Sequence, residues 1–270
     1  MVQRKFNTNI KQINVPICDL KSKPDLNANL ETQLLYGEKV KIINKINNKW
    51  LLCKSIEDCY IGYLRNENLD NETTLNFQVS SLSCFVYEKP NVKSKVITQL
   101  FLNSKVFVLD EQNEWVKILF QNEMAYIYKK GLIKIKNKTN YSTSWVNIAL
   151  NFLNTPYLWG GKSHLGIDCS GLVQLSLRSH NISLPRNSND QLNSKLLISS
   201  SEDKIKKGTL IFWEGHVAIA INAKEIIHAN AFHMKVAVEK FIYAKNRIRN
   251  SYGEILGYKI FKRDSYEKNN

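Results

Sequence analysis

Short runs of β-branched and aromatic residues, separated by turns that contain Asn and Gly, dominate the first half of the chain. Residues 40–43, 50–53 and 60–64 are such runs. Their length and composition predict β-strands rather than helices.

The same pattern returns further along the chain. The segment KVKIINKINNKWLLCKSIEDCYIGYLRNENL aligns with KVFVLDEQNEWVKILFQNEMAYIYKKGLI, which matches Trp50 with Trp115 and Tyr60 with Tyr126. A unit of about 60 residues that occurs twice and consists of short strands predicts two small all-β barrels. The polar stretch KIKNKTN at residues 134–140 then predicts a linker.

Helical periodicity appears in the second half, where one helix is predicted over residues 144–153 and another over residues 169–180. The apolar positions of the first helix recur with the spacing i, i+3, i+4 and i+7: Trp145, Ile148, Ala149 and Phe152. Ser142 or Thr143 is its expected N-cap, and Pro156 stops it.

Strand-like runs follow the two helices, and this order is typical of an α+β domain. The runs cover residues 209–213, 216–221, 225–228 and 236–238. The predicted organisation is therefore two all-β barrels, at residues 1–72 and 73–138, followed by an α+β domain at residues 141–265.

Composition narrows the class of protein. The 270 residues are 43% hydrophobic and 23% charged, which is ordinary for globular proteins. The longest apolar runs, such as residues 217–221, are too short for a membrane span. The N-terminal residues contain no signal-peptide core, so the chain as given is expected to be cytoplasmic.

The formal net charge of +14 raises the question of nucleic-acid or membrane partners. The basic residues are scattered among many Asn and Ile residues rather than gathered into one run. We therefore expect a solvated basic surface with neither nucleic acid nor membrane as a partner, and a monomer is the default expectation.

The cysteines provide little sign of a disulfide framework or a metal site. They are odd in number and irregularly spaced: Cys18, Cys53, Cys59, Cys84 and Cys169. No two of them have the C-x2-C spacing of a zinc site, and we expect no metal and no cofactor. The first four are expected to be small buried hydrophobic residues.

Cys169 stands in a different context, because it follows a Gly-rich loop and begins a predicted helix. The unpaired N–H groups and the dipole at a helix start favour a thiolate, which is the attacking form of cysteine. Nearby backbone N–H groups can also stabilise an oxyanion. A cysteine that only packs at a helix start is the alternative.

Two histidines complement this cysteine. His216 begins one predicted strand and His228 ends the next, and a turn at Asn222 and Ala223 would join the strands as a hairpin. The two imidazoles are then expected at neighbouring positions of one sheet. One would act as general base and the other would fix its tautomer, as in other Cys–His triads.

Six segments of this region occur in the order typical of one peptidase family. They are TPYLWGG, IDCSGLVQ, LPRNSNDQ, GTLIFW, GHVAIAI and IIHAN. Residues 142–262 therefore resemble the NlpC-type cysteine peptidases, a papain-like group that hydrolyses peptidoglycan stem peptides. The resemblance implies a papain-like α+β fold with Cys169 as nucleophile, His216 as general base and His228 as third member of the triad.

The preceding units resemble bacterial SH3-like domains. The combination is similar to intracellular peptidases that recycle cell-wall peptides by cutting the bond between γ-D-Glu and a diamino acid, normally diaminopimelate. Their substrates begin with a free L-Ala amine. A secreted or phage-delivered hydrolase of intact cell wall, a related amidase and an inactive binding module are the alternatives.

The resemblance also implies residues that bind the substrate ammonium group. Asp168 would receive it, or would cap the helix, or would do both. Tyr60 would form a wall of this site, unless it belongs to the barrel core. Glu31 is its expected acidic companion, with Asp58 as the rival and a solvated carboxylate as the alternative.

Further residues are assigned to the carboxylate of D-Glu and to the cleft. Arg186, Ser188 and Ser170 would bind the carboxylate, because guanidinium and hydroxyl groups suit it. Tyr157 and Trp159 would line the cleft, unless they only pack the loop.

Overall fold

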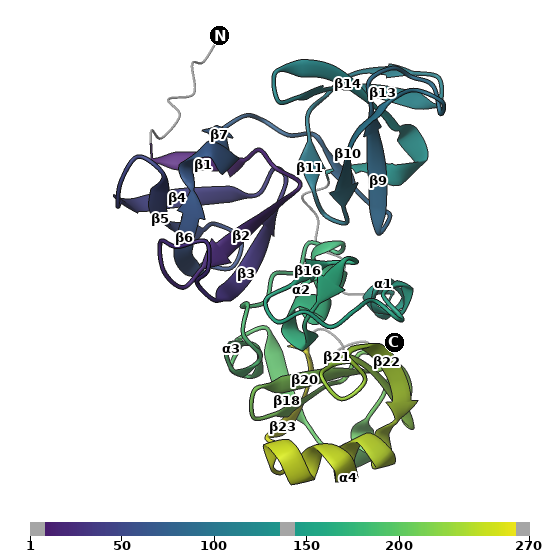
Figure 1. Ribbon diagram of the computed structural model, residues 1–270. Coiled ribbons are helices and arrows are strands. Elements are labelled where there is room, and N and C mark those ends of the chain that lie inside the picture. Colours follow the sequence, from purple (N-terminus) through teal and green to yellow (C-terminus); the bar gives the residue numbers. More distant parts are fainter. Residues whose placement is uncertain (1–8, 136–143, 263–270) are drawn as a thin grey trace. The chain divides into compact units, whose positions relative to one another are not determined.

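The computed structural model describes residues 9–135 and 144–262 and divides the chain into two compact units, residues 1–136 and 137–270 (Figure 1). Ser142 and Thr143, and residues 136–140 of the predicted linker, lie outside the described residues. None of the described helices is long and apolar enough to cross a membrane.

The first half of the N-terminal unit is a single antiparallel sheet in the order β3-β2-β6-β5-β4-β1-β7. Its strands are β1 (Ile10–Ile13), β2 (Ile17–Lys21), β3 (Leu30–Leu35), β4 (Lys39–Lys45), β5 (Trp50–Ser55), β6 (Ile61–Arg65) and β7 (Leu69–Asn71), with a 3-10 turn at Asn66–Asn68. Its core contains Ile13, Cys18, Leu20, Leu34, Val40, Leu51, Cys53 and Leu64.

The second half of this unit repeats the arrangement in two sheets, ordered β10-β9-β14-β13-β12 and β11-β8-β15. The strands are β8 (Phe77–Val79), β9 (Ser83–Tyr87), β10 (Val96–Phe101), β11 (Lys105–Val106), β12 (Val108–Gln112), β13 (Trp115–Phe120), β14 (Glu123–Tyr128) and β15 (Leu132–Lys134), with a 3-10 turn at Lys129–Gly131. The order matches that of the first half if β11 and β12 together stand for β4. The predicted pair of small all-β barrels is therefore confirmed.

The register of the repeat differs from the sequence alignment. Trp50 and Trp115 both begin their strands, as predicted. Two residues after each tryptophan, Leu52 is paired with Tyr63 and Lys117 is paired with Tyr126. Tyr126 therefore corresponds to Tyr63 rather than to Tyr60. The alignment was wrong here because the loop before β6 is longer than the loop before β14.

A tyrosine of the first barrel takes part in the core of the second. Tyr36 follows β3, is buried among the apolar residues of the second barrel, and stacks on Phe120 with ring centroids 5.1 Å apart. The adjacent Gly37 has a φ of +82°, and a Cβ there would lie 2.3 Å from the carbonyl oxygen of Lys105. Only glycine fits this turn without displacing the backbone.

The cysteines of the N-terminal unit follow the prediction with one exception. Cys18 and Cys53 are buried and Cys84 is half-buried. Cys59 is exposed instead, because it lies in the turn just before Tyr60, where it has a φ of 63°.

The C-terminal unit confirms the predicted α+β class. Its main sheet is antiparallel in the order β18-β23-β19-β20-β21-β22, and a short hairpin pairs β16 with β17. The strands are β16 (Lys162–Ser163), β17 (Gly166–Ile167), β18 (Leu197–Ser200), β19 (Leu210–Trp213), β20 (His216–Ala220), β21 (Glu225–Asn230), β22 (Lys235–Lys240) and β23 (Gly257–Phe261). The helices are α1 (Trp145–Asn151), α2 (Cys169–Arg178), α3 (Ser188–Leu192) and α4 (Phe241–Tyr252), with a 3-10 turn at Glu202–Lys204.

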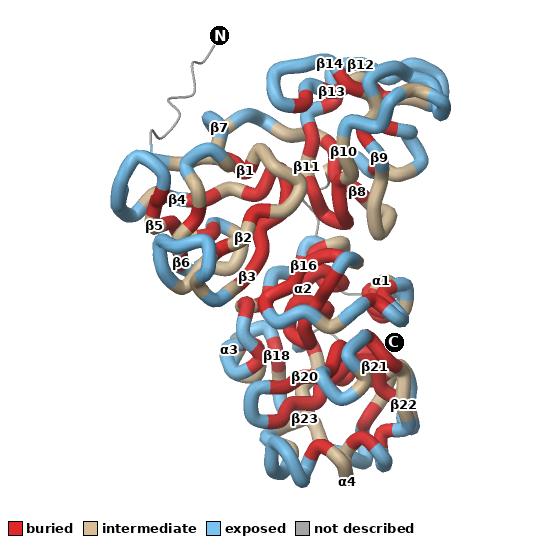
Figure 2. The backbone as a smooth tube through the Cα atoms, in the orientation of Figure 1, coloured by how far each residue is buried: buried red, intermediate tan, exposed pale blue. Residues whose placement is uncertain are grey.

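Helix α2 is the central helix of this unit. Each of its residues is buried, and it packs against β20 and β21, whose residues are also buried apart from Glu225 (Figure 2). A helix enclosed in this way holds its first residues in one position. Cys169 on α2 and His216 on β20, the two residues from which the chemistry is expected, therefore both lie on rigid elements.

Candidate active site

Cys169 is the first residue of α2, and the sequence fixes that start locally. Asp168 has an extended backbone, with φ −100° and ψ 176°, and its side chain accepts a hydrogen bond from the N–H of Gly171 at 2.7 Å. This is an N-cap, so Asp168 both ends the preceding loop and begins the helix. The capping role considered for Asp168 is thus present in the structure.

The sulfur of Cys169 lies beside the strand that carries His216. The side chain is 7% exposed, and the backbone N–H groups of Val217 and Ser170 donate toward the sulfur. Val217 directly follows His216 in β20, so the predicted nucleophile and the start of the predicted base strand are neighbours.

Burial raises the pKa of the Cys169 thiol, and the negative charge of Asp168 adds to this. The two amide donors and Arg186 act in the opposite direction but are weaker. The expected preference for a thiolate at the helix start is therefore outweighed, because desolvation disfavours the charged form. A thiol in this position needs a base that takes its proton during attack.

The two predicted histidines face each other, with His216 Nε2 2.8 Å from His228 Nδ1. Strands β20 and β21 form a hairpin in which Ile219 is paired with Ile227. This register makes the two histidines diagonal neighbours on one face.

The expected turn between these strands is present. The side-chain oxygen of Asn222 accepts the N–H groups of Lys224 at 2.8 Å and Glu225 at 2.9 Å. Asn favours such turns because its side chain can replace a backbone acceptor. The turn residue at position 222 therefore fixes the register that brings the histidines together.

Both imidazoles are buried. Burial lowers the pKa of His216 well below its usual range, and electrostatic repulsion from the nearby groups of His228 and Arg247 lowers it further. Burial also lowers the pKa of His228, although Glu239 opposes the shift. A neutral His216 at neutral pH is able to accept a proton, as a general base must.

Two polar residues near the histidines were missed from the sequence. Oε1 of Glu239, on β22, lies 2.6 Å from His228 Nε2, and Arg247, on α4, donates to the same oxygen. Glu239 directly follows the predicted strand at residues 236–238. The helical signal for α4 is the spacing of its buried residues Phe241, Ala244 and Ile248.

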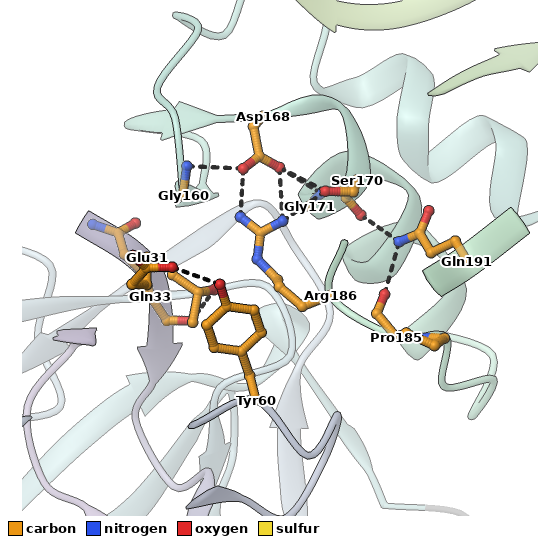
Figure 3. A network of polar contacts seen from close by, with 11 residues as sticks. Glu31, Gln33, Tyr60, Gly160, Asp168, Ser170, Gly171, Pro185, Arg186 and Gln191 are labelled. Carbon is orange, nitrogen blue, oxygen red and sulfur yellow. Dashed lines mark hydrogen bonds and ion pairs between the residues drawn. The ribbon is translucent and has the colours of Figure 1, made fainter. Parts of the chain in front are cut away.

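Arg186 forms a buried ion pair with Asp168 (Figure 3). Its Nη1 and Nη2 donate to the two carboxylate oxygens at 2.9 and 2.5 Å, and Nη1 also donates to Ser170 Oγ at 2.7 Å. Gly160 N–H donates to the same carboxylate at 2.8 Å. Asp168, Arg186 and Ser170, three of the residues expected to bind the substrate, thus form one network, in which Asp168 and Ser170 stand directly beside Cys169 in the sequence.

The network extends to α3. Gln191 Nε2 donates to the carbonyl oxygens of Ser170 at 3.1 Å and Pro185 at 2.9 Å. Ser188, the third residue expected to bind the carboxylate, is the buried first residue of this helix. Gln191 therefore ties the segment before α3 to the first turn of α2.

Tyr157 and Trp159 line a cavity of about 330 Å³ together with His216, His228 and Tyr252. Tyr157 is half-buried, whereas Trp159 is 67% exposed. Burial raises the pKa of Tyr157, and the nearby groups of Cys169 and Asp168 add to this. The two aromatic residues predicted to line a cleft therefore do border a cavity next to His216.

Tyr60 in the N-terminal unit donates its hydroxyl hydrogen to Glu31 at 2.6 Å (Figure 3). Its ring packs against the core of the first barrel, so the core alternative also holds in part. Asp58 contacts the same residue differently, since its carboxylate accepts the backbone N–H of Tyr60 at 3.3 Å. Glu31 is thus a side-chain partner of the phenol.

Comparison with protein families identifies matches along most of the chain. The NlpC/P60 family matches residues 154–252. The bacterial dipeptidyl-peptidase Sh3 domain matches residues 20–69, and the bacterial SH3 domain matches residues 80–147.

Related proteins cover both units. Dipeptidyl-peptidase 6 of Lysinibacillus sphaericus is 29% identical over 232 residues, covering 79% of this chain and 85% of the relative. A gamma-D-glutamyl-L-lysine dipeptidyl-peptidase of Bacillus cereus is 28% identical over 231 residues, covering 75% of this chain and 68% of the relative. The crystal structure of an NlpC/P60 family protein from B. cereus aligns with a TM-score of 0.80 at 20% identity, covering 93% of this chain and 99% of that one, which shows a shared fold.

Proposed function

Since this chain belongs to the NlpC/P60 family of peptidases and carries bacterial SH3 domains ahead of its peptidase domain, we propose that it is a cysteine peptidase. Its substrates are short cell-wall stem peptides, and it cuts the bond between γ-D-Glu and a diamino acid. The proposed diamino acid is diaminopimelate. The observation that carries the proposal is the hydrogen bond between His216 and His228, together with the N–H of the next residue, Val217, which donates toward the sulfur of Cys169.

The reaction begins with a neutral Cys169 thiol and a neutral His216 imidazole. His216 takes the thiol proton of Cys169 as the sulfur attacks the γ-carbonyl carbon of D-Glu, which forms a tetrahedral oxyanion. Backbone N–H groups near Cys169 stabilise this oxyanion. The C–N bond then breaks, and His216 gives its proton to the departing amine of the diamino acid.

A thioester on Cys169 remains after this step. Water attacks its carbonyl carbon while His216 takes a proton from the water, the C–S bond breaks, and the sulfur recovers a proton. The products are the γ-carboxyl group of D-Glu and the free thiol. His216 therefore acts as base, acid and base again within one turnover.

The Asp168 network supports recognition of a dipeptide with opposite charges at its ends. Arg186 and Ser170 offer donors for the D-Glu carboxylate, with Ser188 at the start of α3 as a third group. Asp168 offers an acceptor for the ammonium group of L-Ala. Glu31 and Tyr60, which contact each other, remain the predicted contribution of the first SH3 domain to ammonium binding, with Asp58 as the rival of Glu31.

The names of the relatives support the bond type. The B. cereus and Bacillus subtilis relatives are named gamma-D-glutamyl-L-lysine dipeptidyl-peptidases. A requirement for a free N-terminal amine would restrict the enzyme to short soluble peptides, so we propose a cytoplasmic role in murein peptide recycling.

A peptide series tests this proposal. The protein is incubated with L-Ala-γ-D-Glu-diaminopimelate, its lysine counterpart, its N-acetylated form and intact sacculi, with Cys169→Ala as control. Hydrolysis of the free-amine peptides alone, absent in Cys169→Ala, is the expected result. Equal cutting of the acetylated peptide would contradict the proposed ammonium-binding site. Release of fragments from sacculi would favour a cell-wall hydrolase instead.

A further inference from the structure

A carboxylate outside the proposed triad contacts it directly. Glu239 is half-buried on β22, and its Oε1 lies 2.6 Å from His228 Nε2. In the pairing of β21 with β22, Ile226 is opposite Glu239 and His228 is opposite Ala237. Glu239 is therefore a diagonal neighbour of His228 on the same face of the sheet, and the contact follows from the register.

Other elements hold this carboxylate in place. Arg247 donates to the same Oε1 from α4, and its guanidinium lies 4.2 Å from the ring centroid of Phe232. His233 Nδ1 is 3.9 Å from that oxygen. Burial alone would raise the pKa of Glu239, but the hydrogen bond from His228 and the charge of Arg247 lower it, so Glu239 is ionised at neutral pH.

An ionised carboxylate only accepts hydrogen bonds. The carboxylate of Glu239 therefore determines which ring nitrogens of His228 and His216 carry a proton. His228 must carry its proton on Nε2 in order to donate to Glu239, so its Nδ1 in the neutral ring has only a lone pair. The 2.8 Å contact then requires His216 to donate from Nε2. The lone pair of neutral His216 is left on Nδ1, the nitrogen that remains for the thiol proton.

We propose that Glu239, held by Arg247, is a positioning residue that fixes the tautomer of His228 and through it the tautomer of His216. This inference rests on the proposed function, in which His216 takes the proton of Cys169. Without an acceptor at position 239, His228 is free to place its proton on Nδ1. Its Nδ1–H would then face the N–H of His216, and the base would lose its orientation.

Two substitutions of Glu239 show whether its side chain acts as a hydrogen-bond acceptor or only fills space. Glu239→Leu keeps the approximate volume but removes the acceptor, and we expect kcat to fall about 10–100-fold with KM within about twofold. Glu239→Gln retains a side-chain oxygen, and we expect kcat within about fivefold of the wild type. Glu202→Gln is the matched control, because Glu202 is paired with Lys245 and Tyr258 on the same unit and should leave kcat unchanged.

Two kinetic outcomes would overturn the proposal. A wild-type kcat in Glu239→Leu shows that the contact is dispensable. An equal fall in Glu239→Leu and Glu239→Gln shows that the charge matters and the acceptor geometry does not. Thermal unfolding of each variant shows whether the unit is still folded.

Imidazole ¹⁵N spectra provide a readout that needs no substrate. The Nε2–H tautomer of His228 is expected in the wild type and in Glu239→Gln, and a mixture of tautomers in Glu239→Leu. Unchanged His228 shifts in Glu239→Leu contradict the inference. Hydrolysis that persists in Cys169→Ala contradicts the proposed function instead, and the spectra still decide the role of Glu239.

Discussion

His228 lies between His216 and Glu239 and contacts each of them through a different ring nitrogen, at 2.8 Å and 2.6 Å. The ring of His216, the proposed base, therefore contacts a second imidazole rather than a carboxylate or an amide. A neutral group in this place orients His216 without placing a full negative charge directly against it.

Replacement of His228 is expected to reduce turnover strongly. His228→Ala removes the acceptor of His216 Nε2–H, so kcat should fall by about 10²–10⁴-fold with little change in KM. Steady-state kinetics on the free-amine peptide measure both constants. His180→Ala is the control, because His180 contacts Ser144 and Ser179 rather than the triad. A kcat for His228→Ala equal to that of the control would exclude an orienting role.

The free energy of unfolding is expected to fall as the pH drops below about 6.5. Burial lowers the pKa of His216 and of His228, so the unfolded chain binds protons at a higher pH than the folded chain does. The loss begins near the unfolded pKa of about 6.5 and continues down to the folded pKa, with a slope of at most about 1.4 kcal/mol per pH unit for each histidine.

Urea unfolding at several pH values between 7.5 and 5.0 measures this slope. A variant that carries both His216→Ala and His228→Ala should show a smaller dependence on pH in this range. The same slope in both proteins would show that other groups cause it.

The ion pair of Asp168 and Arg186 is expected to be essential for the stability of the C-terminal unit. Arg186→Ala leaves a buried carboxylate without its guanidinium, which costs about 3–5 kcal/mol. Lys245→Ala breaks the more exposed pair with Glu202 and should cost less than about 1 kcal/mol. Urea unfolding followed by tryptophan fluorescence compares them, and similar losses for both variants would contradict the expectation.

Gly37→Ala is expected to loosen the connection between the two barrels of the N-terminal unit. Its Cβ would lie 2.3 Å from the carbonyl oxygen of Lys105, in addition to the cost of a φ of +82°. A local loss of about 1–3 kcal/mol corresponds to amide exchange about 5–150 times faster in β3 and β11. Gly215→Ala is the control, because its φ is also positive but a Cβ there meets no atom within 4 Å. Unchanged exchange in β3 and β11 would show that the turn adapts.

The strongest sequence patterns predicted the elements that carry the proposed catalytic groups. Helix α2 and strands β20 and β21 were predicted within a few residues of their ends, and the Asn222 turn made the pairing of the two histidines foreseeable. Long apolar runs and a turn residue with one favoured conformation determine such elements locally. The roles assigned to the individual site residues remain predictions.

Other elements depend on information that is not local in the sequence. Helix α4 was missed because its exposed face carries Lys, Arg and Asn, and only three of its residues are buried. The contact of Glu239 depends on the register between β21 and β22, which no short motif specifies. The incorrect match of Tyr126 with Tyr60 has the same origin, since loop lengths shift the register of paired strands.

Arg247 reaches Glu239 from α4, a helix that none of the six recognisable segments of the peptidase domain covers. If Glu239 orients the two histidines as proposed, substitutions in that helix change the turnover rate even when all six segments stay the same. A survey that ranks such enzymes by their signature residues alone would overlook this source of variation.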